Sequence, residues 1–330
     1  MAEDHEDPRE VPWHPRLADR VLGHDGARAL FDAALASGKP HHAWLISGPR
    51  GIGKATLAYK LASALLAQTT PAQTAQWISA RAHPDLFVLE RSLNDSKPRR
   101  LRGEIAVEDS RRLGEFFART SGSGGWRVAI IDAVDDLSSE SGNALLKLVE
   151  EPPPKSIIFL VCHLPGRSLR TLRSRCLKLP LQPLSDTDTE SVLRALHLDP
   201  APDEAELERA VRQSAGSPGR AIDLMSSTGA KAFDLFLRRP NGSEAERLAI
   251  ANHFSARQQS QGDFLVFTDL LLGWLARAAL AQPESAAGNR LSRLHQELSE
   301  RRRIVEGYNL DRRMAVIEAL GQVQDALKAA

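Results

Sequence analysis

The chain is poor in cysteine, which excludes a disulfide-stabilised scaffold. Its 330 residues include 2 cysteines, Cys162 and Cys176, and both lie in or beside apolar, strand-like runs. A buried thiol is the simpler interpretation of each, and a redox or metal-binding role is the alternative. No apolar run approaches the ~20 residues of a membrane-spanning helix, and the acidic start MAEDHEDPRE does not resemble a signal peptide. We therefore expect a cytoplasmic protein with no membrane partner.

An excess of charge of either sign is also lacking. The 43 lysines and arginines nearly balance 42 aspartates and glutamates, which leaves a net charge of +1. The chain as a whole is therefore not built for non-specific binding to nucleic acid, although local basic patches remain compatible with it. The apolar fraction of 42% and the charged fraction of 26% are typical of a globular protein. A chain of 330 residues is long for one domain, so we expect two or three.

The stretch AWLISGPRGIGKAT, residues 43–56, carries the clearest chemical signal. A short apolar run predicts a buried strand, a glycine-rich turn follows, and a helical pattern begins after it. This context makes a phosphate-binding loop credible, because turned-in backbone N–H groups and a helix N-terminus both favour a polyphosphate. The candidate nucleotide-binding residues of the loop are three glycines and a lysine expected on the outer phosphates: Gly48, Gly51, Gly53 and Lys54.

Two catalytic positions of such a site are not filled. The residue after the lysine is Ala55 where the motif has the Ser or Thr that holds Mg²⁺, and Thr56 points about 100° away on a helix. A second apolar strand ends in Asp132, where a carboxylate facing Mg²⁺ belongs, but the next residue is Ala133 instead of a glutamate that would orient water. The loop therefore looks suited to holding a nucleotide and poorly suited to hydrolysing one.

Strands and helices alternate up to about residue 180, which predicts a five-stranded parallel α/β domain. We expect the phosphate-loop strand at its centre and Asp132 at the same sheet edge as Gly53. Residues 1–12 are polar and are expected to be disordered. The predicted strands lie at 43–46, 86–89, 128–131, 157–161 and 177–179.

From Pro183 onward the apolar strand pattern disappears and helices are expected. A small lid of three helices is predicted for 181–228, and its third helix begins at Ser217-Pro218 and carries Arg220 in its first turn. Residues 229–330 read as longer amphipathic helices forming a bundle. The predicted buried faces of two of them are Phe264, Phe267, Leu271, Trp274 and Ala278, and Met314, Ile317, Leu320, Val323 and Leu327.

Several segments together resemble one family, the AAA+ subunits of bacterial clamp loaders. They are HHAWLISGPRGIGKAT (41–56), HPDL (83–86), IID (130–132), NALLKLVEEPPP (143–154), LRSRC (172–176) and GSPGRA (216–221). The phosphate loop alone would indicate only an NTPase, whereas the pair NALLK…EEPP and SRC is highly specific. With the helical C-terminal third, the resemblance covers nearly the whole chain. It implies an AAA+ module on 1–180, a helical lid on 181–228 and a helical collar for oligomerisation on 229–330.

The resemblance also implies roles for single residues. The arginine of the SRC motif, Arg175, matches an arginine finger that reaches the γ-phosphate held by a neighbouring subunit. The alternative is that Arg175 pairs with a local carboxylate. Arg220 matches the lid arginine, called sensor 2, that touches bound nucleotide in relatives. The implied partners are the other clamp-loader subunits (gamma/tau and delta) in a ring, and through that complex the sliding clamp and primer–template DNA.

The chain departs from the family at cofactor positions. Ala55 and Ala133 together make hydrolysis in cis negligible, while binding of ATP or ADP stays open. Many relatives hold zinc with four cysteines after the phosphate-loop helix, but residues 67–85 contain no cysteine and His83 alone cannot supply a structural site. No zinc or other required cofactor is expected.

Three functions follow from these features, and we favour the first. It is a structural clamp-loader subunit of the DNA replication machinery, which does not hydrolyse nucleotide in its own site and provides Arg175 to the site of a neighbouring subunit. The second is a catalytically competent AAA+ ATPase subunit of the gamma/tau kind, which Ala55 and Ala133 disfavour. The third is a DNA-binding AAA+ initiator, which would carry a basic recognition module where this chain has apolar-striped helices.

Overall fold

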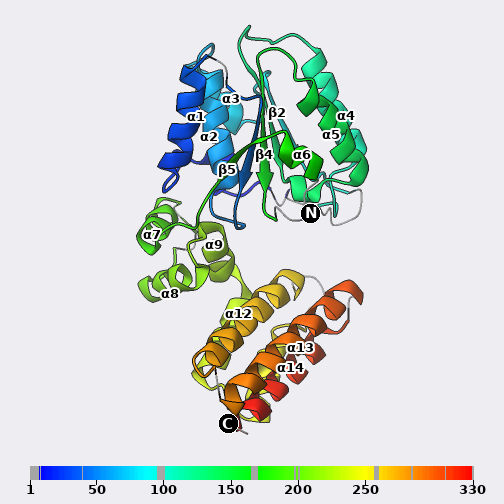
Figure 1. Cartoon of the computed structure of the whole chain (residues 1–330). Coiled ribbons are helices and arrows are strands. Elements are labelled where there is room, and N and C mark those ends of the chain that lie inside the picture. The colour runs from blue at the N-terminus through cyan, green and yellow to red at the C-terminus, as the bar shows by residue number, and fades with distance from the viewer. Residues whose placement is uncertain are drawn as a thin grey trace, which may run out of the picture. The chain divides into compact units, whose positions relative to one another are not determined.

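The chain forms two compact units, residues 1–221 and 222–330, in the computed structural model (Figure 1). The residues that the structure describes are 7, 9–38, 40–94, 101–164, 170–196, 198–199, 201–255, 260–283, 285–308 and 310–328. The boundary predicted at 180 and the one predicted at 228 stay predictions, because the division into two units does not test them.

A five-stranded parallel sheet is the centre of the first unit, as predicted. Its order is β2-β3-β4-β1-β5, and every pairing is parallel. The strands are β1 (Ala43–Ser47), β2 (Leu86–Glu90), β3 (Arg127–Asp132), β4 (Ser156–Cys162) and β5 (Leu177–Pro180). Because parallel strands end at a common edge, Gly53 and Asp132 follow strand ends on the same side of the sheet, as expected. The expected central place of β1 is wrong. The middle strand is β4, whose seven residues are all buried, and β1 lies between it and the edge strand β5.

The two faces of the sheet bury alternate residues of the same strands. Trp44 and Ile46 of β1 pack on one face with the apolar side of α2, and Ala43 and Leu45 pack on the other with residues of α4 and α5. A strand covered on both faces is apolar at every position, which is why its sequence reads as a continuous run. Figure 1 shows α1–α3 on one face and α4–α6 on the other. Both cysteines are buried in the second of these cores.

Six helices of this unit pack against the sheet or lie beside it. They are α1 (Asp25–Ala36), α2 (Lys54–Leu66), α3 (Thr74–Ser79), α4 (Val107–Ala118), α5 (Ser139–Glu150) and α6 (Arg170–Ser174). The lid follows as α7 (Asp186–Ala195), α8 (Glu204–Ser214) and α9 (Pro218–Ser226). Helix α3 lies in a stretch without helical periodicity, and the sequence did not predict it.

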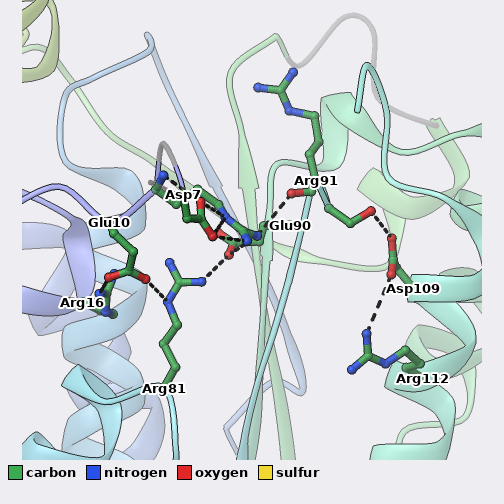
Figure 2. A network of polar contacts seen from close by, with 10 residues as sticks. Asp7, Glu10, Arg16, Arg81, Glu90, Arg91, Asp109 and Arg112 are labelled. Atoms are coloured by element: carbon green, nitrogen blue, oxygen red, sulfur yellow. Dashed lines mark hydrogen bonds and ion pairs between the residues drawn. The ribbon is translucent and has the colours of Figure 1, made fainter. Parts of the chain in front are cut away.

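Part of the N-terminal segment is ordered by charge pairs, which corrects the prediction of disorder for residues 1–12. Residues 1–6 and 8 lie outside the described residues. Glu10 pairs with Arg16 and with Arg81, and Arg81 also contacts Glu90 at the end of β2 at 3.1 Å (Figure 2). Arg9 reaches the same Glu90 at 3.0 Å. Composition could not show this, because the partners lie about 80 residues further along the chain.

The second unit has a hydrophobic core of its own. Its helices are α10 (Thr228–Arg238), α11 (Glu244–Asn252), α12 (Ser260–Leu280), α13 (Ala286–Tyr308) and α14 (Arg312–Lys328). Phe264, Phe267 and Leu271 are buried in it as predicted, and Trp274 and Ala278 pack against it. No strand occurs after Pro180 in the described part of the chain, and none of its helices is long and apolar enough to cross a membrane.

The predicted buried face of α14 is correct except at its first residue. Leu320 and Val323 are buried, and Ile317 and Leu327 are partly buried against the same core. Met314, one turn before Ile317, is 46% exposed. It lies in the first turn of the helix, where fewer neighbouring elements cover the side chain.

Candidate functional site

The loop between β1 and α2 is filled by its own lysine. The Lys54 Nζ atom donates to the backbone oxygens of Gly48, at 2.8 Å, and Pro49, at 2.5 Å. The side chain is buried, and burial lowers the pKa of Lys54 to about 8, with nearby Asp132 acting in the opposite direction. The ammonium group that would meet a phosphate is therefore already bound to the carbonyl groups of the loop.

The first turn of α9 lies directly on this loop. The Gly219 N–H donates to the Gly51 oxygen at 3.0 Å, and the Ser217 hydroxyl donates to the Arg50 oxygen at 2.9 Å. A Cβ atom added to Gly219 would lie 2.8 Å from the Gly51 Cα. The two backbones approach so closely that only glycine fits on each side. The start of α9 is thus in direct contact with the phosphate loop at Arg50 and Gly51.

Arg220 follows this contact immediately. It lies in the first turn of α9, as predicted, and its backbone N–H donates to the capping Ser217 hydroxyl at 3.2 Å. Its side chain is exposed. Its role toward a nucleotide stays a prediction.

His24 contacts the loop from the N-terminal side, and the sequence analysis did not single it out. Its Nε2 atom lies 2.7 Å from the Ile52 oxygen, and the side chain is buried. Gly23 before it has a φ of +72°, and a Cβ there would lie 2.4 Å from the Leu184 side chain. The sequence did not predict the contact of His24 with the loop, since a single histidine before a helix is not specific to any one role.

Asp132 ends β3 beside the loop, in register with Glu90 of β2. Burial raises the pKa of Asp132 to about 6, and the Glu90 carboxylate adds to this shift while Lys54 opposes it. Ala133 is buried, and its methyl group can neither orient nor deprotonate water. Ala55, in the first turn of α2, packs against the apolar core.

The next acidic residue along the chain, Asp135, accepts hydrogen bonds from groups at the C-terminal end of β4. Its carboxylate accepts from the backbone N–H groups of His163 and of Leu164, the latter at 3.1 Å, and from the Cys162 thiol. These bonds satisfy donors that the sheet leaves unpaired where β4 ends. The sequence gave no reason to assign Asp135 this position.

Several features of this arrangement oppose the binding of a magnesium nucleotide. The loop carbonyls hold the lysine, the start of α9 contacts the loop, and the position that would bind the metal through a hydroxyl is Ala55. Among the described residues, no three His, Cys, Asp or Glu side chains are grouped as metal ligands. Gly48, Gly51, Gly53, Lys54 and Asp132 are thus brought together as predicted, but in a closed site.

Arg175 lies elsewhere, at the end of α6 on the opposite face of the sheet from α2 (Figure 1). Its Nη2 atom is 2.7 Å from the Glu150 Oε1 atom, and its Nη1 atom donates to the Thr171 oxygen at 3.0 Å. The side chain is 40% exposed. The guanidinium is thus exposed at the surface and pairs with a local carboxylate. The role of Arg175 in trans stays a prediction. The partner, Glu150, belongs to the EEPP segment, but the sequence alone did not indicate that Glu150 would contact Arg175.

Comparisons with known proteins agree with the sequence motifs. A family model described as "DNA polymerase III, delta subunit" matches residues 23–185. The chain is 38% identical to DNA polymerase III subunit delta' of Pseudomonas aeruginosa over 200 residues, which cover 58% of each chain. It is 30% identical to subunit delta' of Escherichia coli over 259 residues, covering 74% of this chain and 72% of that one.

The chain is also similar to DNA polymerase III subunits of other names. DNA polymerase III subunit tau of Escherichia coli is 28% identical over 324 residues, covering 89% of this chain and 48% of that protein. The match to the Pseudomonas relative spans somewhat less than two thirds of that protein's length. The Escherichia coli delta' relative is matched over nearly three quarters of its length at 30% identity. The chain therefore belongs to the family of DNA polymerase III delta' subunits.

Proposed function

We propose that this chain is a clamp-loader subunit that lends Arg175 to a nucleotide held by a neighbouring subunit and does not hydrolyse nucleotide itself. One observation carries the proposal most directly. Arg175, the arginine of the SRC motif, is exposed and lies on the face of the sheet opposite α2. The loop itself is closed by Lys54 and α9.

The chemistry needs an arginine at this place. A guanidinium that meets the γ-phosphate neutralises charge that develops in the transition state, and such contacts are worth about 10³ to 10⁵ in rate. Its planar fork of N–H groups matches two oxygens of one phosphate through two parallel hydrogen bonds, a geometry that the single ammonium nitrogen of a lysine lacks. The proposed partners are the gamma/tau and delta subunits, with the sliding clamp and primer–template DNA reached through the assembled complex.

The alternative of a competent ATPase subunit needs residues that this chain does not have. Ala55 offers no hydroxyl for a metal, and Ala133 offers no carboxylate for water. The closed loop adds a second obstacle, since Lys54 would have to exchange its carbonyl partners for a phosphate. The initiator alternative finds no support in α12 and α14, whose apolar faces pack inside the second unit.

The test is a reconstituted complex that carries Arg175→Ala. We expect normal assembly, because a partly exposed arginine contributes little to folding, and a loss of about 10³-fold in hydrolysis at the one site that Arg175 serves. Arg175→Lys should recover only part of this loss. Arg170→Ala, on the same helix and also exposed, is the matched control and should hydrolyse at the wild-type rate.

The measurement is DNA-stimulated ATP hydrolysis, with the isolated chain assayed alongside. Equal rates for wild-type and Arg175→Ala complexes of equal assembly would refute the trans role. Turnover by the isolated chain at the rate of a competent AAA+ subunit would refute the inactive site. Equilibrium binding of ATP and ADP to the isolated chain, compared with Lys54→Ala, measures whether the closed loop opens for nucleotide.

A further inference from the structure

Glu150 is the last residue of α5 and contacts Arg175 directly. The Glu150 Oε1 atom lies 2.7 Å from the Arg175 Nη2 atom, and the two side chains are 45% and 40% exposed. The Arg175 Nη1 atom has a separate partner, the Thr171 oxygen, at 3.0 Å. The guanidinium is therefore held from two directions, by a side chain of α5 and by the backbone of α6.

The backbones that carry this pair are anchored in the core. Val149, next to Glu150, is buried, and Leu172 and Cys176 on either side of Arg175 are buried in the same hydrophobic cluster. The Cys176 thiol also donates to the Leu172 oxygen at 3.1 Å. Because both attachment points are fixed, the position of the guanidinium depends on its contacts with the Glu150 carboxylate and the Thr171 oxygen.

An arginine side chain with no partner samples many rotamers, and a productive contact with phosphate must then select one of them. The two contacts of Arg175 use one N–H on each of two nitrogens, while a guanidinium has five N–H donors. Donors remain available for an incoming phosphate. An exposed pair of this kind is also weak, so it orients the arginine without holding it against a stronger anion.

We propose that Glu150 is a positioning residue, which orders Arg175 before the neighbouring subunit presents its nucleotide. This inference rests on the proposed function of Arg175. Glu150 does not touch the nucleotide in this scheme. It acts by reducing the number of rotamers that the Arg175 side chain samples before it contacts the phosphate.

Glu151 provides a matched control. It has the same side chain, follows Glu150 directly, and is exposed. Among the ion pairs of the described residues, Arg175 is joined to Glu150 and not to Glu151. A general effect of negative charge near this surface would act through both glutamates, whereas positioning acts through Glu150 alone.

The experiment uses the reconstituted complex with five variants of this chain: Glu150→Ala, Glu150→Gln, Glu151→Ala, Arg175→Ala, and the double variant Glu150→Ala with Arg175→Ala. The measurements are kcat and KM of DNA-stimulated ATP hydrolysis and the amount of assembled complex. We expect Glu150→Ala to lower kcat at the affected site roughly tenfold, with KM and assembly unchanged. Glu150→Gln keeps an acceptor oxygen and should retain most of the rate, and Glu151→Ala should match the wild type.

The double variant separates positioning from a structural effect. If Glu150 acts through Arg175, adding Glu150→Ala to Arg175→Ala lowers the rate no further. A lower rate for the double variant than for Arg175→Ala would overturn the inference. The inference would also be overturned if the Glu150→Ala complex hydrolysed ATP at the wild-type rate or faster while the Arg175→Ala complex was slow. If Arg175→Ala itself hydrolyses at the wild-type rate, both the proposed function and this inference are wrong.

Discussion

At the scale of single residues, the closed loop depends on a lysine and an aspartate whose ionised forms are both disfavoured. Burial lowers the pKa of Lys54 to about 8 and raises the pKa of Asp132 to about 6. Each charge partly stabilises the other, but neither has an ion-pair contact among the described residues as short as that between Arg175 and Glu150. The two residues therefore reduce the stability of the folded chain near neutral pH.

The lowered pKa of Lys54 predicts a gain of stability in mild alkali. Between pH 8 and the ordinary lysine pKa near 10.5, the folded chain loses the Lys54 proton while the unfolded chain keeps it. The unfolded state then binds more protons, so the free energy of unfolding rises with pH over this window. From pH 7.5 to 9.5 the gain should be about 1–2 kcal/mol.

Urea unfolding of the wild type and of Lys54→Met at these two pH values isolates the effect, because the other titrating groups are common to both chains. Lys54→Met should lack this part of the rise with pH. Identical dependence of the two chains on pH would show that Lys54 titrates normally and is not buried in its own loop.

Single residues are where sequence reasoning succeeded and failed most visibly. The absence of a metal-binding hydroxyl at Ala55 and of a water-orienting carboxylate at Ala133 could be predicted from the sequence, because each of these motif positions has one chemical role. The burial of Lys54 against Gly48 and Pro49 could not, since it depends on the path of the loop in three dimensions. The partner of Arg175 likewise required the geometry that brings the end of α5 to α6.

At the scale of elements, the contact between α9 and the phosphate loop determines whether that loop is open. It consists of a hydrogen bond between two backbones and two glycines in close approach. The capping serine at the start of α9 could be predicted, but its second hydrogen bond, to the loop, could not.

Replacing Gly219 should therefore disturb this contact. The new Cβ atom of Gly219→Ala would meet the Gly51 Cα at 2.8 Å, so one backbone has to move. We expect a loss of roughly 1–3 kcal/mol in the free energy of unfolding, as for other overpacked positions. The matched control is Gly114→Ala in α4, where a Cβ meets nothing within 4 Å and helix propensity predicts a gain of about 0.5–1 kcal/mol. Denaturant unfolding measures both, and a gain for Gly219→Ala would show that α9 does not rest on the loop.

The elements themselves were mostly predictable. The first four strands each contain a continuous apolar run, whereas β5 has Lys178 between two leucines. Helix α5 ends at Glu150, shortly before the three prolines that begin at Pro152. The order of the strands was less accessible, because it depends on which strand is buried most completely, and that strand is β4. Helix α3 was missed because only Thr74 and Ile78 of its six residues are buried.

At the scale of the whole molecule, the chain has separate hydrophobic cores. The core of the second unit is built from its own helices, around Phe233, Phe236 and Phe267. The disappearance of strands after residue 180 was predicted from the sequence and holds for the described residues, while the boundaries predicted at 180 and 228 stay predictions. The place where one unit ends, within α9, has no marker in composition.

The second unit should therefore fold by itself. A fragment that begins at Ser227 keeps the serine hydroxyl that caps α10 through Gly229 and Ala230, and it retains nearly all of the core around Phe267. We expect a helical circular dichroism spectrum and a cooperative thermal transition for residues 227–330. A spectrum of unfolded chain for the fragment, beside a folded full-length protein, would show that its core depends on the first unit.

The burial of the cysteines has a practical consequence for spectroscopy. Cys162 and Cys176 are the only thiols of the chain and both are buried, and burial raises the pKa of Cys176 to about 12. Because the accessible thiolate is the nucleophile that attacks a maleimide dye, the native protein offers such dyes almost no target. A cysteine placed at an exposed position such as Leu280, which is 76% exposed, would then carry the dye alone. A single fluorophore can therefore be attached without first removing the native cysteines. Its signal would then report the assembly of this chain with other subunits in real time.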